Sequence, residues 1–259
     1  MRKFLAFFLV TLILAAAPAG GQEVRRRPIF ASSSTLNTGL VAYWKMDEAS
    51  GTRADDQGSN DLTDNNTVTS NTGKIGNAGQ FTAANSEYLS LADNADLSTG
   101  DIDFTFAMWV YGDTLASGAD FRGIISKWEG SNQEYILQNN GVTSRLIWSV
   151  GSSGSNRTDL TASSFGAPST STWYFIVCGH DAANDQIFIS VNDGTVDTAS
   201  HSGGVFNGAS AFEIGHHQQG FQYWDGRVDE VGFWKKKLSA AEITELYNAG
   251  AGKTCCPFN

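Results

Sequence analysis

The feature that constrains this chain most is a series of short apolar runs, each bounded by turn residues. In IDFTFAMWVY (102–111), apolar residues alternate with Asp103, Thr105 and Ala107, which is the period of a strand with one buried face. WYFIVCGH (173–180) is nearly continuously apolar, as expected for a strand buried on both faces. Asp193-Gly194 follows another alternating run and is a strong hairpin signal.

Such runs recur about every 10 to 15 residues without intervening helices, which is typical of an antiparallel sandwich or jelly roll. The composition agrees, because Gly, Ser, Thr, Asn and Asp are abundant and aromatic residues make up 12% of the chain. A length of 259 residues suits one such domain. We therefore predict an all-β fold, a two-sheet antiparallel jelly-roll sandwich.

One helix is expected near the C-terminus, in LSAAEITELYNAG (238–250). Ser239 and Glu242 have the spacing of a capping box, in which each side chain bonds the other residue's backbone N–H. Gly250 has the position of a C-terminal stop. The apolar stripe of this helix is narrow, so packing must hold it, and we expect it on the rim of the sandwich.

The N-terminus has the pattern of a signal peptide. Arg2 and Lys3 precede the apolar run Phe4 to Leu14, and Ala17-Pro18-Ala19 offers a cleavage site. We predict a signal peptide over 1–21 and a flexible linker over 22–38, with no membrane span in the mature chain. The protein is then secreted, extracellular or periplasmic.

The charge and the cysteines narrow the partners. A net charge of −10 argues against nucleic acid, and the basic cluster Arg25 to Arg27 lies in the predicted linker. Cys178 lies in a strand-like run and is expected to be a buried free thiol. The adjacent Cys255 and Cys256 would either link to another chain or be exposed thiols.

Several segments together resemble one family. GRVDEVGFW (226–234), followed by LSAAEITELYNAG, is similar to the closing strand and helix of laminin-G-like, concanavalin A-like lectin and glucanase jelly rolls. GLVAYWKMDEASG (39–51) resembles the family's first strand, and DFTFAMWVY (103–111) its central strand. The resemblance covers 39–252 as one domain and leaves 253–259 as a tail.

This resemblance implies two curved antiparallel sheets in which the first and last strands are neighbours. Members of the family are usually carbohydrate-binding or adhesion modules, often with a calcium ion. The fold alone does not assign a function, because it accommodates many ligands.

Asp229 and Glu230 are adjacent acids in the closing strand. Strand geometry predicts that they point to opposite faces, which argues against a catalytic pair. Two alternatives remain for the inward acid. It either accepts hydrogen bonds from backbone or hydroxyl donors and locks the terminal strands, or it helps to hold calcium with Asp47 or Glu48 on the neighbouring first strand and Asp55 or Asp56 in the following loop. The candidate metal ligands are Asp47, Asp55 and Asp229.

A glycan surface is expected around the polar run HHQQGFQYWDG (216–226), because sugars dock on aromatic faces beside Asp, Asn and Gln. His216 and His217 are either ligand contacts or exposed loop residues. The candidate ligand-binding residues are Trp128, His216, His217, Tyr223, Trp224 and Asp225.

No pattern of paired carboxylates suited to a glycosidase occurs in the chain. The leading hypothesis is a secreted non-catalytic module that binds a glycan or a cell-surface protein, with calcium as the candidate cofactor. The first alternative is a structural protein of a surface appendage or virion that associates with copies of itself. The second is a glycan-active enzyme.

Overall fold

The computed structural model describes residues 34–217 and 222–258. The predicted signal peptide and residues 22–33 of the predicted linker, with Arg25 to Arg27, lie outside the described residues. So do 218–221, within the predicted glycan loop, and Asn259.

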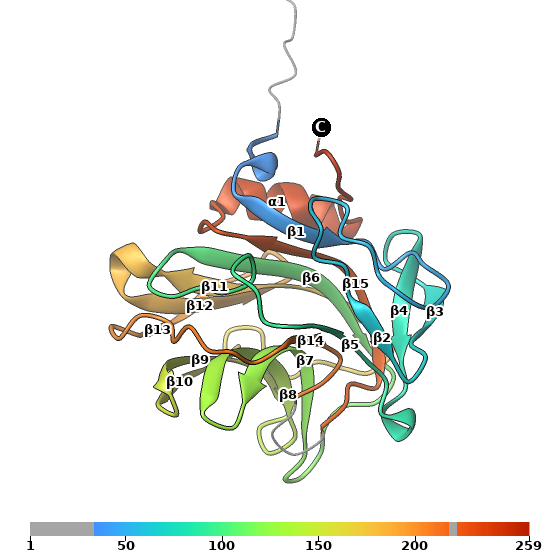
Figure 1. The fold of residues 1–259 in the computed structure, drawn as a ribbon, viewed down its shortest axis with the longest axis horizontal. Helices are drawn as coiled ribbons and strands as arrows, with labels where there is room; N and C mark the ends of the chain where they lie inside the picture. Colours follow the sequence, from blue (N-terminus) through green and yellow to red (C-terminus); the bar gives the residue numbers. More distant parts are fainter. Residues whose placement is uncertain (1–33, 218–221, 259) are drawn as a thin grey trace, which may run out of the picture. The chain divides into compact units, whose positions relative to one another are not determined.

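The described chain forms two antiparallel sheets, which confirms the predicted fold class (Figure 1). The first sheet has the order β13-β12-β11-β6-β15-β4-β3, and β1 also pairs with β15. Its strands are β1 (Leu40–Trp44), β3 (Thr69–Thr72), β4 (Asn77–Phe81), β6 (Phe104–Gly112), β11 (Trp173–Asp181), β12 (Gln186–Val191), β13 (Asp197–Ser200) and β15 (Gly226–Trp234).

The second sheet has the order β10-β9-β8-β7-β14-β5-β2. Its strands are β2 (Thr63–Asn65), β5 (Tyr88–Leu91), β7 (Phe121–Glu129), β8 (Asn132–Asn140), β9 (Arg145–Gly154), β10 (Arg157–Thr161) and β14 (Phe212–Ile214). One α-helix, α1 (Ala240–Tyr247), and four short 3-10 helices complete the described residues: η1 (Thr35–Asn37), η2 (Ala83–Asn85), η3 (Ala182–Asn184) and η4 (Asn248–Gly250).

The main core lies between the two sheets. Phe104, Phe106 and Met108 of β6 point into it, as their alternation predicts. Trp44 of the first sheet stacks on Phe212 of the second with 5.3 Å between ring centroids. Burial of these large rings contributes most of the free energy that holds the sheets together.

A second apolar layer covers the outer face of the first sheet. Trp109 and Trp234 point into it, and Tyr247 at the end of α1 stacks on Trp109. The helix therefore lies on the sheet's outer face, above β1 and β15 in Figure 1. The prediction that it lies on the rim is wrong, because Trp109 and Trp234 leave a wide apolar surface that only an added layer can bury.

Both ends of the domain extend into this outer layer. Leu36 is fully buried, and its carbonyl accepts a 2.7 Å hydrogen bond from Trp234 Nε1. Phe258 is 1% exposed and pairs through its backbone with the Asn37 side chain. Residues on both sides of the predicted domain, 39–252, therefore pack in this layer.

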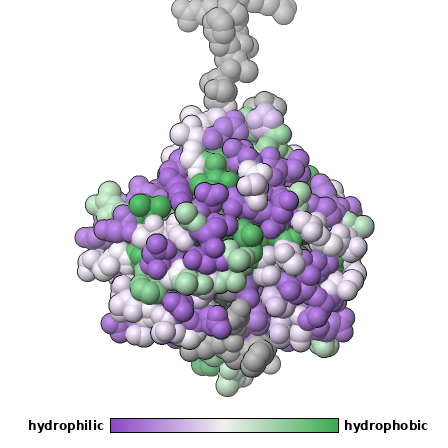
Figure 2. All heavy atoms as spheres, in the orientation of Figure 1, coloured by the Kyte–Doolittle hydropathy of each residue, from purple (hydrophilic) through white to green (hydrophobic). Residues whose placement is uncertain are grey.

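The surface is mostly hydrophilic on the face that Figure 2 draws, with small separate apolar areas. In the described chain, Val142 and Val196 are the only large hydrophobic residues with wide exposure. Among the same residues, no helix is long and apolar enough to cross a membrane.

Candidate functional site

The predicted glycan loop begins at His216, just after β14. The His216 ring stacks on Tyr223 with a centroid distance of 4.4 Å and lies 4.8 Å from the Tyr88 ring. Its Nδ1 lies 2.9 Å from Oε2 of Glu213. His216 is buried, and its ring packs against the partly exposed ring of Tyr223.

His217 lies beside a surface hollow of about 270 Å³. Phe121 at the start of β7, Gln138 of β8 and Arg157 at the start of β10 also line it, together with Gln222. Gln138 faces outward because its neighbour Leu137 points into the core between the sheets. The hollow therefore lies on the outer face of the second sheet.

A second hollow of about 160 Å³ shares Phe121 and Gln222 with the first. Tyr223, Arg122 and Asp120 line it as well. The two hollows together are called the groove below, and each is named by its distinctive residue, the Arg157 hollow and the Tyr223 hollow.

Asp225 holds the edge of the groove without lining it. Its Oδ2 accepts a 2.6 Å hydrogen bond from the Thr114 hydroxyl and lies 3.5 Å from Nη1 of Arg122. Oδ1 accepts a hydrogen bond from the backbone N–H of Ala83. The carboxylate thus fixes the position of Arg122, and the sequence-predicted ligand contact at Asp225 is a supporting interaction.

Two polar atoms of the groove are buried without a hydrogen-bond partner in the described chain. They are Nδ1 of His217 and Oε1 of Gln222. Burial lowers the pKa of His217 to about 4, so its ring is neutral at physiological pH. Buried polar atoms are rarely left unpaired in native proteins. The Gln222 side chain lies close enough to His217 to raise its pKa, so these two groups either pair with each other or meet water or ligand hydroxyls.

The structure contradicts two predicted ligand residues. Trp128 and Trp224 are each 1% exposed, so neither offers a ring face to a sugar. Trp224 belongs to the core between the sheets. A tryptophan in a polar loop resembles a binding residue in sequence, but burying its large ring is the stronger free-energy gain here.

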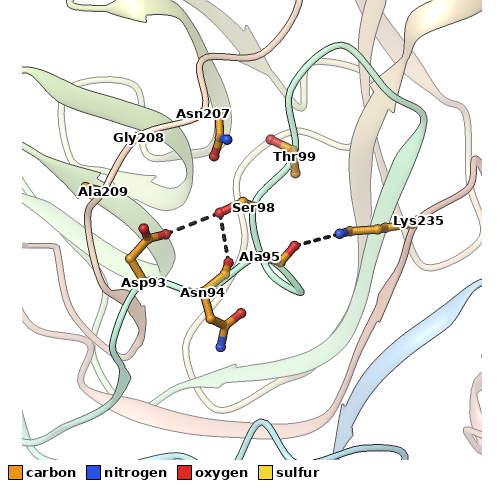
Figure 3. A pocket seen from close by; sticks show the side chains of 9 residues that line it. All are labelled: Asp93, Asn94, Ala95, Ser98, Thr99, Asn207, Gly208, Ala209 and Lys235. Atoms are coloured by element: carbon orange, nitrogen blue, oxygen red, sulfur yellow. Dashed lines mark hydrogen bonds between the residues drawn. The ribbon is translucent and has the colours of Figure 1, made fainter.

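A larger hollow of about 470 Å³ lies elsewhere, between the β5–β6 segment and Asn207 to Ala209 (Figure 3). Most of its polar groups already have protein partners. The Lys235 ammonium donates to the carbonyl of Ala95, and the Ser98 hydroxyl to Asp93. The Thr99 hydroxyl donates to Glu134. With its groups satisfied and no aromatic lining, this hollow is the weaker candidate despite its volume.

Asp229 and Glu230 both lie on the outer side of the first sheet. Asp229 pairs with Trp109 and Gly232 with Ala107, so β15 advances three residues while β6 advances two. The extra residue is Glu230, which has a φ of 50°. The prediction that strand alternation places the acids on opposite faces is wrong, because a β-bulge interrupts the alternation at this point.

The two acids are buried and hydrogen-bonded. Oδ2 of Asp229 accepts from the backbone N–H groups of Lys74 and Ile75 at 2.7 and 3.0 Å. The Tyr43 hydroxyl donates to Oε2 of Glu230. Burial raises the pKa of Asp229 to about 8 and that of Glu230 to about 7. Asp229 thus accepts backbone donors, as in the structural alternative, but these bonds join β15 to the segment between β3 and β4 and do not reach the first strand.

The candidate calcium ligands already accept hydrogen bonds from N–H donors. Asp55 accepts from the backbone N–H groups of Tyr43 and Gln57 through one oxygen and from Asn60 through the other. Asp47 accepts from the backbone N–H of Asn77. The described residues hold no group of three or more His, Cys, Asp or Glu side chains arranged for a metal. These carboxylates do not fit a shared calcium site as arranged, and calcium binding stays a prediction.

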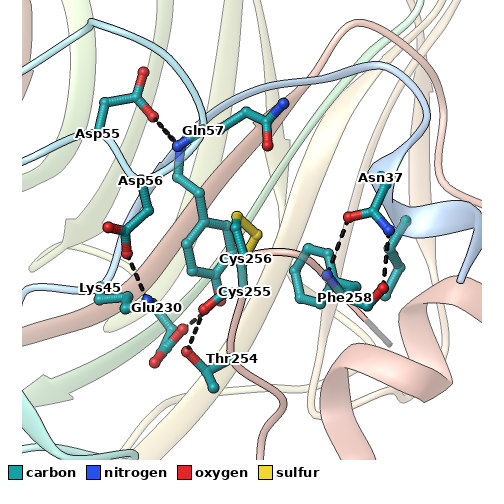
Figure 4. Close-up of a disulfide and its surroundings, with 12 residues drawn as sticks. Asn37, Lys45, Asp55, Asp56, Gln57, Glu230, Thr254, Cys255, Cys256 and Phe258 are labelled. Atoms are coloured by element: carbon teal, nitrogen blue, oxygen red, sulfur yellow. Dashed lines mark hydrogen bonds and ion pairs between the residues drawn. A yellow bond between two sulfur atoms is a disulfide. The ribbon is translucent and has the colours of Figure 1, made fainter.

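The two C-terminal cysteines are bonded to each other. Figure 4 shows this disulfide close to Thr254 and Glu230. The predictions of a link to another chain or of exposed thiols are therefore wrong, because each cysteine's partner is its neighbour. Cys178 is a buried free cysteine, as predicted, and burial raises the pKa of its thiol.

A family model described as the concanavalin A-like lectin/glucanases superfamily matches residues 83–244. The chain belongs to this family. The matched range runs from η2 into α1 and includes β6, β11 and the groove residues. No curated protein matches the sequence.

Three solved structures show the same fold at low identity. The binding domain of Paraclostridial Mosquitocidal Protein 1 is 14% identical, with a TM-score of 0.69 over 83% of this chain and 53% of that chain. The binding domain of Botulinum Neurotoxin DC, solved with SialylT, is 12% identical, with a TM-score of 0.63 over 83% and 52%. The chain thus spans about half the length of these toxin chains.

The third is domain 4 of AbnA, a GH43 extracellular arabinanase from Geobacillus stearothermophilus, in complex with arabinotriose. It is 18% identical, with a TM-score of 0.57 over 80% of this chain and 97% of that chain. Identities this low establish the shared fold and nothing finer.

Sequence reasoning missed Phe121, Gln138, Arg157 and Gln222. Gln138 carried a signal, since a polar residue directly after the inward Leu137 faces outward on a strand. Arg157 carried none, because β10 reaches the groove only through its pairing with β9. Gln222 belongs to the predicted polar run, where its aromatic neighbour Tyr223 is the stronger sequence signal for a sugar contact.

Proposed function

We propose that the chain is a non-catalytic module that binds a carbohydrate in the groove. The proposal rests on one observation: the partly exposed rings of Phe121 and Tyr223 lie beside Gln222 and His217. Oε1 of Gln222 and Nδ1 of His217 are buried polar atoms without a hydrogen-bond partner in the described chain. A sugar ring has an apolar face for the aromatics and hydroxyls for the amide and imidazole.

The lining of the groove supports binding over hydrolysis. A glycosidase generally needs two carboxyl groups about 5 to 9 Å apart. Among the described lining residues, Asp120 is the only carboxylate. The arabinanase domain solved with arabinotriose is an example of the same fold holding a sugar.

A glycan array tests the proposal. The wild-type chain is expected to bind a subset of glycans, and Phe121→Ala should weaken that binding about tenfold or more, since an aromatic platform is lost. Val142→Ala, at an exposed position away from the groove, is the control. Equal binding by wild type and Phe121→Ala would place the glycan elsewhere. Binding to no glycan, with reversible self-association on a sizing column, would favour the assembly role.

Two finer parts of the proposal are tested separately. The predicted signal peptide implies export, and N-terminal sequencing of protein from the medium or periplasm should find a start near Gln22. Calcium dependence is tested by running the array with calcium and with a chelator. Loss of binding in the chelator would support it, and unchanged binding would refute it.

A further inference from the structure

The two hollows of the groove differ in charge. In the Arg157 hollow, the described lining residues include one charged side chain, the Arg157 guanidinium, and no carboxylate. The polar remainder consists of Gln138, Gln222 and His217. His217 is neutral at physiological pH, since burial lowers its pKa and the Arg157 charge lowers it further. Among uncharged hydrogen-bonding groups, the hollow therefore presents the Arg157 guanidinium, whose carboxylate partner, Asp159, is not among the described lining residues.

The guanidinium of Arg157 has donors to spare. Its Nε lies 3.1 Å from Oδ1 of Asp159, and each of the two side chains is nearly half exposed. An ion pair this exposed is weak. The described chain gives the two terminal nitrogens of Arg157 no protein partner, so a ligand can take both.

In the Tyr223 hollow, the positive charge of Arg122 has carboxylate partners within the protein. Arg122 lies 3.5 Å from Asp120 on one side and 3.5 Å from Asp225 on the other. Two carboxylates thus face its one positive charge, whereas Arg157 has a single carboxylate partner. What this hollow offers a ligand is the Tyr223 ring and neutral hydrogen-bonding groups.

We propose that the groove selects an acidic glycan, with a carboxylate-bearing sugar in the Arg157 hollow and a neutral sugar in the Tyr223 hollow. The planar fork of an arginine matches a carboxylate with two parallel hydrogen bonds. The shared wall of Phe121 and Gln222 places the two sugars next to each other along one chain. The inference rests on the proposed glycan binding and specifies its substrate class.

The selection is a local property. The chain as a whole has a net charge of −10, which disfavours anions at long range. At physiological salt, charges farther away than about 8 Å are largely screened. The contact with Arg157 therefore determines whether an acidic sugar is preferred. A bound uronate should therefore depend on Arg157 more strongly than on any other described arginine.

Paired ligands test the proposal. Oligosaccharides of hyaluronan, alginate and polygalacturonate are printed beside the same compounds with their carboxyl groups amidated, which removes the charge and keeps the sugar. At least one acidic form is expected to bind about tenfold more tightly than its amidated partner, which is the range of one charge-assisted hydrogen bond. Hyaluronan, in which uronate and neutral sugars alternate, should show the largest ratio.

Two variants test whether Arg157 causes the preference for acidic glycans. Arg157→Gln should bring the ratio of acidic to amidated affinity close to one. Arg145→Gln, which removes an arginine bonded to the carbonyl of Ser163 outside the groove, should keep the wild-type ratio. Thermal melts establish that both variants fold.

The outcomes separate the inference from the proposed function. Equal binding of acidic and amidated forms, binding of neutral glycans alone, or an acidic preference that survives Arg157→Gln would overturn the inference while leaving glycan binding intact. Binding of no printed glycan in either form would overturn both.

Discussion

At the scale of single residues, the protonation of Asp229 makes the stability of the fold depend on pH. Its Oδ1 is buried and has no hydrogen-bond partner in the described chain. With a pKa near 8, the folded protein holds a proton there at neutral pH, whereas the unfolded chain releases it near pH 4. The folded state thus binds more protons than the unfolded state between about pH 4 and 8. Stability from this group is present at low pH and is lost as pH rises through that window.

Asp229→Asn should remove this pH dependence. Asparagine keeps an oxygen for the N–H groups of Lys74 and Ile75 but does not titrate. The unfolding free energy of the variant, relative to wild type, is expected to rise by a few kcal/mol between pH 5 and pH 9 in urea titrations. Asp96→Asn, at an exposed position, should parallel wild type. Parallel curves for Asp229→Asn would show that Asp229 is ionised in the folded state.

Single residues also show where sequence reasoning ends. The GRVDEVGFW pattern predicts a strand next to the first strand, and β15 does pair with β1. It contains no sign of the bulge, because an extra residue is visible only against the register of β6. Strand alternation therefore predicts opposite faces for Asp229 and Glu230, and the bulge interrupts that alternation.

The helix α1 illustrates what is predictable at the scale of elements. Its capping box is present, with Ser239 accepting from the Glu242 N–H and Glu242 accepting from the Ser239 N–H. The end is different from the prediction, because Asn248 takes the left-handed C-cap position ahead of Gly250. Caps follow local rules that a sequence reveals, whereas the face that a helix covers depends on distant strands.

Ser239→Ala should lower the unfolding free energy by about 1 kcal/mol, since the first turn loses a hydrogen-bond acceptor for its N–H groups. Urea titration measures the change, and Ser202→Ala, at an exposed turn position, is the control. Glycan binding should be unaffected because α1 covers the first sheet and the groove lies on the second. No loss of stability would mean that packing alone holds the helix.

The strands can be predicted from the sequence as single elements, but the way they meet at the groove cannot. The alternation in 102–111 gave β6 and its inward residues correctly. The groove, in contrast, collects residues from β7, β8 and β10 and from the segment after β14. Only the order of the strands in the sheet brings these residues together. A sequence pattern can therefore predict at most the polar segment after β14 and not the strand residues beside it.

At the scale of the whole molecule, the outer layer joins the two ends of the domain. The backbone of Phe258 pairs with the Asn37 side chain, and the Tyr43 ring meets the Phe258 ring edge-on at 5.5 Å. The domain is therefore closed by contacts between residues more than 200 positions apart. Contacts of that range require the rest of the fold first, so a local sequence pattern does not reveal them.

Phe258→Ala should lower the free energy of unfolding by about 3 to 5 kcal/mol, because a fully buried ring is removed from a packed layer. Phe121→Ala is the matched comparison, since the same change at a partly exposed ring should cost less. Urea titration of the two variants measures both. Equal losses would indicate that the C-terminal segment is not packed as described.

The position of the ends has a practical consequence for handling the protein. Residues 34 to 38 and 253 to 258 lie with α1 on the outer face of the first sheet, while the strands that carry the groove lie in the second (Figure 1). A protein immobilised on a sensor chip through its C-terminus would present the groove to the flowing sample. An affinity tag fused at that end would likewise leave the groove accessible, so the binding experiments need no tag removal.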